Sequence, residues 1–312
     1  MPEITVVIPT RDRSALLRRT VRCALRQRDV DLQVVVVDDA SRDDTAAAIA
    51  GLGDPRVTLV RNARPEGVSA ARNRGIGLAA AEWIALLDDD DLWAPSKLAS
   101  QLREARRLSR CWACAGSVTV DDALRIVAGR PPLSDEAMLR QLPRRNVVPA
   151  GASNVIARRS AIVAAGGFDR QLRHIADWDL WIRLGRLGPP AVVCEPLVAY
   201  QLHATNASAD AGSIAAELSR VEARHRERPH ALRVDRAFAY RWAAWHYLIA
   251  GRPARAIRAY AHAIAVGDIT SLARLVVALL HPGIARQPLA RHRPDPAWEA
   301  RAAPWLHELA SV

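Results

Sequence analysis

The stretch Leu86-Leu87-Asp88-Asp89-Asp90-Asp91-Leu92-Trp93 decides the fold, because it joins an apolar run to four consecutive carboxylates. The run from Trp83 to Leu87 is typical of a buried strand, and the acidic cluster follows its C-terminal end. Open α/β sheets bind ligands at the carboxyl ends of their strands. The sequence therefore predicts that this cluster lines a binding site.

The cluster also predicts a bound cation. Four adjacent carboxylates repel one another, so a cation or well-placed hydrogen-bond donors must offset their charge. Asp88 and Asp90 are two residues apart, and in extended backbone their side chains point to the same side. Paired carboxylate oxygens suit Mg²⁺ or Mn²⁺. As an alternative, Asp89 or Asp91 caps a helix that begins near Pro95.

Composition bounds the class of protein. The 312-residue chain is long enough for one large domain or for two, and half of its residues are apolar. Its formal net charge is +11, yet Lys97 is the only lysine, so we attribute the charge to a bias toward arginine and predict no nucleic-acid partner. An arginine excess does suit a phosphate-bearing substrate. The oligomeric state is left open.

Targeting and cysteine signals are weak. Met1-Pro2-Glu3 leads directly into a strand, and no apolar run approaches the ~18 residues that a membrane span needs. We therefore expect a soluble, cytoplasmic protein. Cys111 and Cys114 form a C-x-x-C pair without a second pair or a nearby histidine, which favours buried thiols over zinc or disulfides.

Strands alternate with helices through the first hundred residues. We expect strands at 4–8, 32–37, 57–60 and 83–87, with a helix to about Gln27 after the first of them. Ser41 and Ser69 are expected to cap the next two helices. This alternation predicts βαβ units and a mostly parallel sheet. The dinucleotide motif G-x-G-x-x-G is absent after the first strand, which argues against a Rossmann dehydrogenase.

The second hundred residues are less regular. A helix is expected from Pro95 to about Leu108 and a strand over 111–120, whereas residues 121–149 are rich in Arg and Pro and predict irregular structure on the acceptor side. A further strand is expected at 155–157. Another helix opens within 174–183.

The last hundred residues indicate a helical tail. The small, polar run Thr205–Ser213 is typical of a linker. Beyond it, one tetratricopeptide-like hairpin with its turn at Gly251-Arg252-Pro253 is predicted by the spacing of Tyr240, Ala244, Tyr247, Ala256, Tyr260 and Ala263. One repeat cannot bury its own face, so we expect the hairpin to pack on the catalytic region or on a partner. Residues 271–280 are apolar, which favours a buried core helix over a membrane-surface helix.

Several motifs carry a family resemblance. They are Val7-Ile8-Pro9-Thr10, Val36-Val37-Asp38-Asp39-Ala40-Ser41, Ala71-Arg72-Asn73-Arg74-Gly75, the acidic stretch above, Gly166-Gly167-Phe168-Asp169, Asp177-Trp178-Asp179-Leu180-Trp181 and Tyr200-Gln201-Leu202-His203. In order and spacing they resemble the inverting glycosyltransferases of family two over about residues 3–206. The resemblance implies a GT-A-type, Rossmann-like, mostly parallel α/β sheet flanked by helices in residues 1–206, followed by an all-helical region in 207–312.

The resemblance also implies a nucleotide-sugar site. Pro9, Thr10, Arg11, Asp39 and Arg72 are then expected to hold the base and ribose, with Asp88 and Asp89 beside them. A carboxylate at a strand end can accept from a base N–H, and a guanidinium offers flat, forked donors. As alternatives, Asp39 caps the next helix and Arg72 pairs with a surface acid.

By the same resemblance, Asp90 is the expected metal ligand, and Asp88 contacts ribose or a metal-bound water. His203 lies where relatives often carry a histidine near the metal and diphosphate, and an imidazole suits Mn²⁺ better than Mg²⁺. A lone histidine is more often structural, so both interpretations of His203 stay open.

Asp177 is the catalytic base that the resemblance implies. The family commonly shows Glu-Asp where this chain has Ala176-Asp177. Asp177 would take the proton from an acceptor hydroxyl as it attacks the anomeric carbon. As an alternative, Asp177, like Asp179, is a helix-terminal carboxylate that meets the macrodipole. The absence of the usual Glu affects the expected orientation of the acceptor more than the expected class of reaction.

We therefore predict a metal-dependent inverting glycosyltransferase that moves a sugar from a nucleotide-sugar, preferably a UDP-sugar, to a hydroxyl of a glycan or lipid-linked acceptor, as in cell-surface polysaccharide synthesis. We expect that the C-terminal helices could make peripheral contact with the inner face of the membrane. Ala176 and the repeat-like tail suggest one alternative, a non-catalytic sugar-nucleotide-binding or scaffold protein. A nucleotidyltransferase is disfavoured, because Arg11-Asp12-Arg13-Ser14 lacks the glycine of a phosphate-cradling loop.

Overall fold

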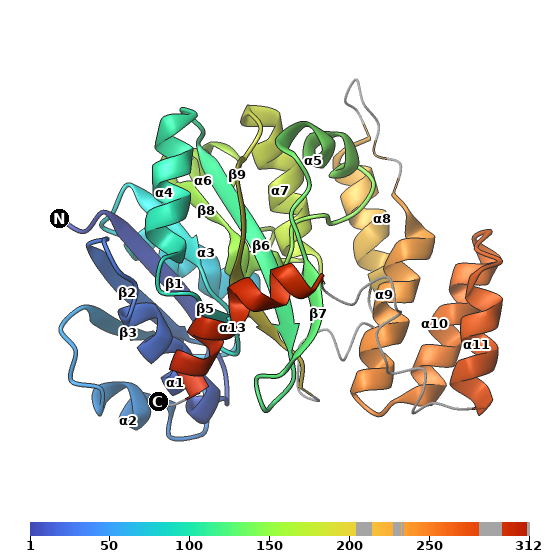
Figure 1. Ribbon diagram of the computed structural model, residues 1–312, viewed down its shortest axis with the longest axis horizontal. Helices are drawn as coiled ribbons and strands as arrows, with labels where there is room; N and C mark the ends of the chain where they lie inside the picture. The colour runs from blue at the N-terminus through green and yellow to red at the C-terminus, as the bar shows by residue number, and fades with distance from the viewer. Residues whose placement is uncertain (204–213, 227–231, 233, 281–294, 311–312) are drawn as a thin grey trace.

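The computed structural model describes residues 1–203, 214–226, 232, 234–280 and 295–310 (Figure 1). Its strands are β1 (Ile4–Thr10), β2 (Leu32–Asp38), β3 (Val57–Arg61), β4 (Trp83–Leu86), β5 (Leu92–Trp93), β6 (Trp112–Val120), β7 (Ile126–Arg130), β8 (Ile156–Arg158) and β9 (Ala191–Gln201). Its helices are α1 (Ser14–Leu25), α2 (Thr45–Ala50), α3 (Val68–Leu78), α4 (Lys97–Arg107), α5 (Asp135–Gln141), the 3₁₀ turn η1 (Gly151–Asn154), α6 (Arg159–Ala164), α7 (Ala176–Leu187), α8 (Ile214–Arg224), α9 (Arg236–Ile249), α10 (Pro253–Ala265), α11 (Ser271–Leu280) and α13 (Pro296–Ala310).

One sheet runs through the molecule in the order β3-β2-β1-β4-β8-β6-β9-β5, with β7 paired to β6. β1 pairs in parallel with β2 and β4, and β2 pairs in parallel with β3, as the alternation of strands and helices predicts. Beyond β4 the sheet is mixed, because β8 is antiparallel to both β4 and β6. The chain segments that follow β1, β2 and β4 therefore meet at one edge.

The sheet is buried on both faces, so its side chains divide between two cores. Val6 and Ile8 belong to the core under α1, α4 and α13, whereas Val7 between them belongs to the core under α3, α6 and α7. This alternation follows from the two-residue period of a strand. Gly75 brings α3 against β1, since a Cβ there would lie 2.4 Å from Val7 Cγ1.

The prediction of irregular structure over residues 121–149 is wrong in two places. Asp121 orders the turn after β6 by accepting from the amides of Ala123 and Arg125, and β7 then pairs antiparallel with β6. Farther on, the Ser134 hydroxyl accepts from the Ala137 amide and caps α5. A short cap and a short turn were sufficient to form both elements within an Arg- and Pro-rich segment.

The two predicted serine caps are also wrong. α2 begins at Thr45, and the Ser41 hydroxyl instead accepts from the amide of Asp12 in the turn after β1. Ser69 lies inside α3, where its hydroxyl donates to the carbonyl of Leu172 at 2.7 Å. Both side chains tie together loops that are distant in sequence, which local spacing does not reveal.

The predicted helical hairpin is present as α9 and α10, with Gly251 at φ +70° in the turn between them. It packs on the rest of the chain, as expected for a single repeat. The Asp235 amide donates to the carbonyl of Arg144 at 2.8 Å, and the Arg145 guanidinium lies 5.4 Å from the Phe238 ring centroid. The predicted linker Thr205–Ser213 lies outside the described residues.

Two other elements of the expected C-terminal region contact the α/β part directly. α13 crosses the sheet (Figure 1), where a Cβ on Gly116 would lie 2.3 Å from the Trp298 ring, and Trp298 Nε1 donates to Ser117 O. α8 packs along α7, and His225 after it bonds Asp179 at 2.9 Å. The division at residues 206 and 207 stays a prediction, with these contacts running across it.

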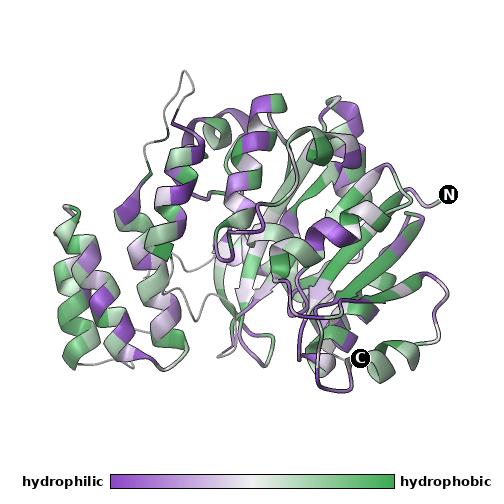
Figure 2. Ribbon diagram, turned by 180° about the vertical axis from the view of Figure 1, so that it is seen from behind, coloured by the Kyte–Doolittle hydropathy of each residue, from purple (hydrophilic) through white to green (hydrophobic). Residues whose placement is uncertain are grey.

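α11 is not the buried core helix that we favoured. Only Ser271 and Ala278 of this helix are buried, whereas its large aliphatic side chains on the outside are exposed, namely Leu272, Val276, Val277, Leu279 and Leu280. Figure 2 shows α11 as an apolar helix at one end of the molecule. Among the described helices, α11 included, none is long and apolar enough to cross a membrane.

Candidate functional site

The acidic stretch after β4 forms a tight turn, not the extended backbone assumed from its sequence. The Asp91 amide donates to the carbonyl of Asp88 at 3.3 Å, which closes the turn. The turn sends Asp88 and Asp90 to different partners. Asp88 keeps 33% side-chain exposure, whereas Asp90 keeps 8%. Solvent therefore reaches Asp88 more easily than Asp90.

Asp91 has a structural place in this turn. It accepts from the Ser153 hydroxyl at 2.5 Å and from the Gln201 amide at 3.1 Å. Its burial, together with the charges of Asp90 and Asp88, raises its pKa well above the ordinary value. These bonds, and not a helix cap, account for the position of Asp91.

Asp89 joins this turn to the turn after β1. It accepts from the Thr10 hydroxyl at 2.7 Å and from Arg13 at 3.0 Å. Burial and the neighbouring Asp90 raise the pKa of Asp89 to about 7, although Arg13 and Thr10 oppose the rise. The ends of β1 and β4 are thereby held as one unit.

Asp90 has a cationic neighbour and a histidine beside it. Its Oδ2 accepts from Arg13 Nη1 at 2.7 Å and lies 2.9 Å from His203 Nε2, which follows β9. The ion pairs with Asp89 and Asp90 raise the pKa of Arg13 although burial opposes this rise. In the part of the chain that the structure describes, no three His, Cys, Asp or Glu side chains are grouped as a ready-made metal site.

Asp88 and Arg72 form the second charged pair of the site. Arg72, on α3, donates from Nη2 to Asp88 Oδ1 at 2.5 Å, and its guanidinium lies 5.1 Å from the Phe168 ring centroid. Asn73 fixes Phe168 by bonding both its amide and its carbonyl at 2.8 Å. Gly167 at φ +64° permits this approach, because a Cβ there would lie 2.8 Å from Asn73 Oδ1. The predicted glycine turn thus packs the Phe168 ring against Arg72.

Asp39, which follows β2, supports the loop that leads into α3. Its carboxylate accepts from Asn62 Nδ2 at 2.7 Å and from the amides of Glu66 and Gly67 at 2.8 Å each. Asp39 therefore orders the entry to α3, the helix that carries Arg72, and does not cap α2. Its contacts with a nucleotide stay a prediction.

The three predicted residues at the end of β1 have unlike environments. Pro9 and Thr10 are the last two residues of the strand, whereas Arg11 is exposed. The neighbouring Arg13, which the motif did not single out, makes the ion pairs with the acidic turn. Its signal in the sequence was only its position in the same turn.

Asp177 lies in the first turn of α7, beside η1. Its Oδ1 accepts from the Trp178 amide at 2.7 Å, and its Oδ2 accepts from Asn146 Nδ2 at 3.1 Å. Gly151 at φ +52° passes close by, since a Cβ there would lie 2.9 Å from Asp177 Oδ2. Burial raises the pKa of Asp177, and the Arg72 charge acts against that rise while the Asp88 charge adds to it. Asp177 is thus electrostatically coupled to the Arg72–Asp88 pair.

Glu217 is a residue that sequence reasoning missed. It is a buried side chain of α8, and its Oε2 accepts from the amides of Arg173, His174 and Ile175 at 2.9 to 3.3 Å. These amides immediately precede α7, so Glu217 holds the backbone that leads into Asp177. A carboxylate bonded to three amides fixes a loop strongly. Its only sequence signal was a Glu on an otherwise amphipathic helix.

Comparison with known proteins finds relatives in sequence, including these two. The succinoglycan biosynthesis protein ExoO of Rhizobium meliloti is 36% identical over 160 residues, which cover 51% of this chain and 44% of that protein. The UDP-Glc:alpha-D-GlcNAc-diphosphoundecaprenol beta-1,3-glucosyltransferase WfaP of Escherichia coli is 30% identical over 102 residues, 33% of this chain and 41% of the relative. The chain thus spans less than half the length of either protein.

A solved structure shares the fold. The mannosyltransferase PcManGT from Pyrobaculum calidifontis, in complex with GDP-Man and Mn²⁺, aligns over 99% of this chain and 86% of its own with a TM-score of 0.58 and 21% sequence identity. This likeness confirms the predicted GT-A-type fold. The family model described as "Glycosyl transferase family 2" matches residues 5–162, just over half of the 312 residues. The matched region runs from β1, except its first residue, to β8 and includes the acidic turn. The chain belongs to glycosyl transferase family 2.

Proposed function

We propose that this protein transfers a sugar from a nucleotide-sugar to a hydroxyl group with inversion at the anomeric carbon. The observation that carries the proposal is the chain of contacts at the strand ends. Arg72 contacts Asp88 directly and is coupled electrostatically to Asp177, while Asp90 and His203 lie at the other side of the same turn. These contacts support a donor site at the strand ends with Asp177 as the proton acceptor beside it.

The donor is proposed to lie along the ends of β1, β2 and β4. Pro9, Thr10, Arg11, Asp39 and Arg72 are the proposed groups around its base and ribose, with Asp88 and Asp89 beside them. Arg72 supplies forked donors, and Asp88 is the acid of the turn that solvent reaches most easily. A UDP-sugar is the preferred donor, in keeping with the UDP-Glc specificity that the name of the E. coli relative states.

Asp90 and His203 fit a divalent cation. Asp90 Oδ2 and His203 Nε2 lie 2.9 Å apart, and a carboxylate oxygen with an imidazole nitrogen is a suitable pair of ligands for Mn²⁺. Arg13 donates to the same oxygen, so a bound cation would take the place of that contact. The PcManGT complex contains Mn²⁺. When bound, such a cation neutralises charge on the departing diphosphate. Asp88 is proposed to contact the ribose or a water of that cation.

Asp177 is the proposed base. Its raised pKa makes it a better proton acceptor than an ordinary aspartate, and Asn146 and the Trp178 amide fix the orientation of its carboxylate. Asp177 would remove the proton from the acceptor hydroxyl while that oxygen forms the new bond to the anomeric carbon and the nucleotide leaves from the opposite face.

The acceptor is proposed to be a glycan or a lipid-linked saccharide. The E. coli relative is named for an undecaprenol-diphosphate substrate. The exposed aliphatic side chains of α11 suit peripheral contact with the inner face of a membrane. A cytoplasmic location agrees with a nucleotide-sugar donor. The alternative is a scaffold protein that only binds the donor. The transfer assay described next separates this alternative from the enzyme.

The test is a transfer assay with a panel of UDP- and GDP-sugars, offered with Mn²⁺ or with EDTA to the full chain and an undecaprenyl-diphosphate saccharide. We expect release of the nucleotide from one donor, transfer only with the metal, and a product whose anomeric configuration, measured by NMR, is opposite to that of the donor. Tight donor binding without any transfer or hydrolysis would instead identify the scaffold protein.

A further inference from the structure

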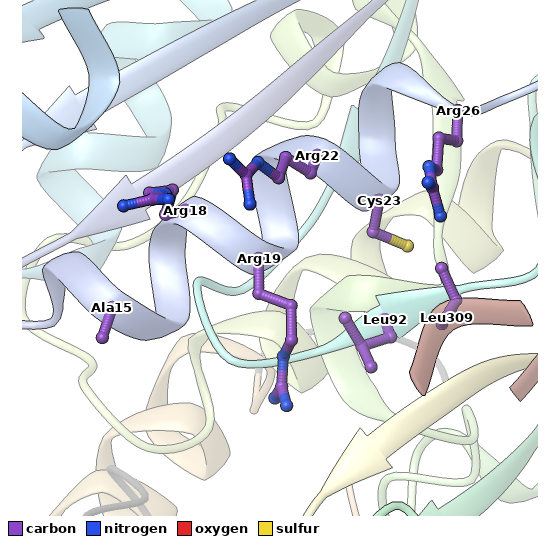
Figure 3. Close-up of a pocket in the computed structure, with 8 residues that line it drawn as sticks. All are labelled: Ala15, Arg18, Arg19, Arg22, Cys23, Arg26, Leu92 and Leu309. Atoms are coloured by element: carbon purple, nitrogen blue, oxygen red, sulfur yellow. The ribbon is translucent and has the colours of Figure 1, made fainter. Parts of the chain in front are cut away.

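An arginine-lined cavity lies away from the strand ends, between α1 and the end of α13. Its volume is about 280 Å³. Three arginines of α1 and Arg26 just after it line the cavity, and Leu92 and Leu309 form an apolar part of its wall (Figure 3). The polar lining thus comes from one helix, and the apolar lining comes from β5 and α13.

Three of the four arginines that line this cavity have no acidic partner among the described residues. Arg18 and Arg22 of α1 and Arg26, the residue just after it, are spaced four residues apart and are exposed. Within the described residues, no carboxylate lies within 4.0 Å of any of the three, although Arg28 nearby pairs with Glu308. Like charges at this spacing destabilise a helix, so the row has a cost that an anion would remove.

Arg19 connects the cavity to the acidic turn. Its Nη2 donates to the side chain of Gln201, and the Gln201 amide in turn donates to Asp91 Oδ1 at 3.1 Å. The Nε of Arg19 is buried and has no hydrogen-bond partner among the described residues. A buried N–H without an acceptor is costly, and a ligand oxygen in the cavity would satisfy it.

We propose that this cavity binds a phosphate group, carried by a lipid or free in solution. Guanidinium forks match phosphate oxygens in pairs, and four of them line one cavity. The leucine side chains favour a lipid phosphate, because its hydrocarbon chain would cover them. None of the described residues that line the cavity is aromatic, so they offer a nucleotide base no ring on which to stack. The inference does not depend on the proposed transfer reaction.

The experiment compares two double variants of the full chain with the same change in charge. Arg22→Glu with Arg26→Glu alters the cavity, whereas Arg140→Glu with Arg226→Glu alters exposed arginines of α5 and the end of α8. One arm measures co-flotation with vesicles of phosphatidylglycerol in phosphatidylcholine, and with phosphatidylcholine alone. A second arm titrates inorganic pyrophosphate calorimetrically. The melting temperature and donor binding are recorded for each variant.

We expect the wild-type chain to bind the anionic vesicles, the cavity variant to bind them at least tenfold more weakly, and the control variant to stay within about threefold of the wild type. The same pattern with pyrophosphate alone would support the phosphate site and identify a soluble ligand. Arg22→Gln with Arg26→Gln repeats the test if the glutamate variant unfolds. Equal losses in the cavity and control variants, or no binding in either arm, would overturn the proposal.

Discussion

Residues 4–93, the parallel half, and residues 112–226, the mixed half, build the candidate site by different means. In the parallel half the acidic site groups lie just after strands, as Asp39 follows β2 and Asp88 comes two residues after β4, and Arg72 lies on α3. In the mixed half Asp177 depends on distant partners. Asn146 bonds it, and Glu217 holds the loop before it.

This difference shows which site residues are positioned by their own strand and which depend on segments distant in sequence. A parallel sheet brings strand ends together by its topology, so a residue after a strand is placed by the fold itself. A helix start such as that of α7 must be anchored by other segments. We therefore expect substitutions in the parallel half, and of His203 that contacts it, to change donor binding, and substitutions of Asp177 and Glu217 in the mixed half to change turnover.

The largest effect is expected for Asp177→Asn. Loss of the proton acceptor should reduce the transfer rate by ~10²–10⁴-fold, because general-base catalysis contributes about that much. Initial rates at saturating donor measure the change. Asp29→Asn, an exposed aspartate in a turn at the opposite edge of the sheet, is the matched control. An Asp177→Asn variant with activity within threefold of the wild type would remove Asp177 from the mechanism.

Asp90→Asn should act on the other half. The change removes the charge that faces Arg13 and His203, and a charge-assisted contact of this kind is worth about 1.5–3 kcal/mol, or roughly 10- to 100-fold in donor affinity with Mn²⁺ present. Calorimetry measures the affinity. If Asp90 acts through the metal, EDTA should weaken the wild type but add little to the loss in the variant. Full additivity of the two losses would contradict that role.

A smaller effect is expected for Glu217→Gln. The neutral amide keeps an oxygen for the amides of residues 173–175 but removes its charge, so the loop before α7 should loosen and kcat should fall by roughly tenfold. The donor dissociation constant should not change. Glu222→Gln on the same helix, whose side chain pairs with Arg236, is the control. A change in donor affinity with an unchanged kcat would contradict the division between the halves.

The smallest expected effect is the pH dependence of the transfer rate and of the stability. Burial raises the pKa of Asp177, and the base must be deprotonated, so the rate should fall as the pH drops through that raised pKa, above the ~3.9 of an ordinary aspartate. The folded chain also takes up this proton more readily than the unfolded chain. Ionisation of Asp177 therefore destabilises the fold above that pKa, and Asp177→Asn should melt no lower than the wild type at neutral pH.

Much of the parallel half could be predicted from sequence. The apolar strands and the carboxylates after them are local patterns, and they located β1 to β4 and the acidic turn within one or two residues. The alternation rule failed only inside the turn, where Asp88 and Asp90 diverge because the backbone bends. Arg13 was missed because its partners lie 76 and 77 residues away.

The mixed half was less predictable because its contacts are long-range. Asp177 was found through a motif, but Glu217 lies on another helix and contacts backbone atoms, for which no side-chain pattern exists. Helix α5 has only seven residues, which is too short for a clear helical pattern in the sequence. α11 was assigned to the core from its apolar composition alone, whereas its exposure depends on what packs beside it.

Calorimetric titration of UDP-sugars, with and without Mn²⁺, into the wild type and Asp177→Asn tests the central claim most directly. The account predicts that both proteins bind the same donor with equal affinity, that Mn²⁺ strengthens binding in both, and that only the wild type transfers the sugar. Failure of either protein to bind any nucleotide-sugar in the presence of the metal would contradict it.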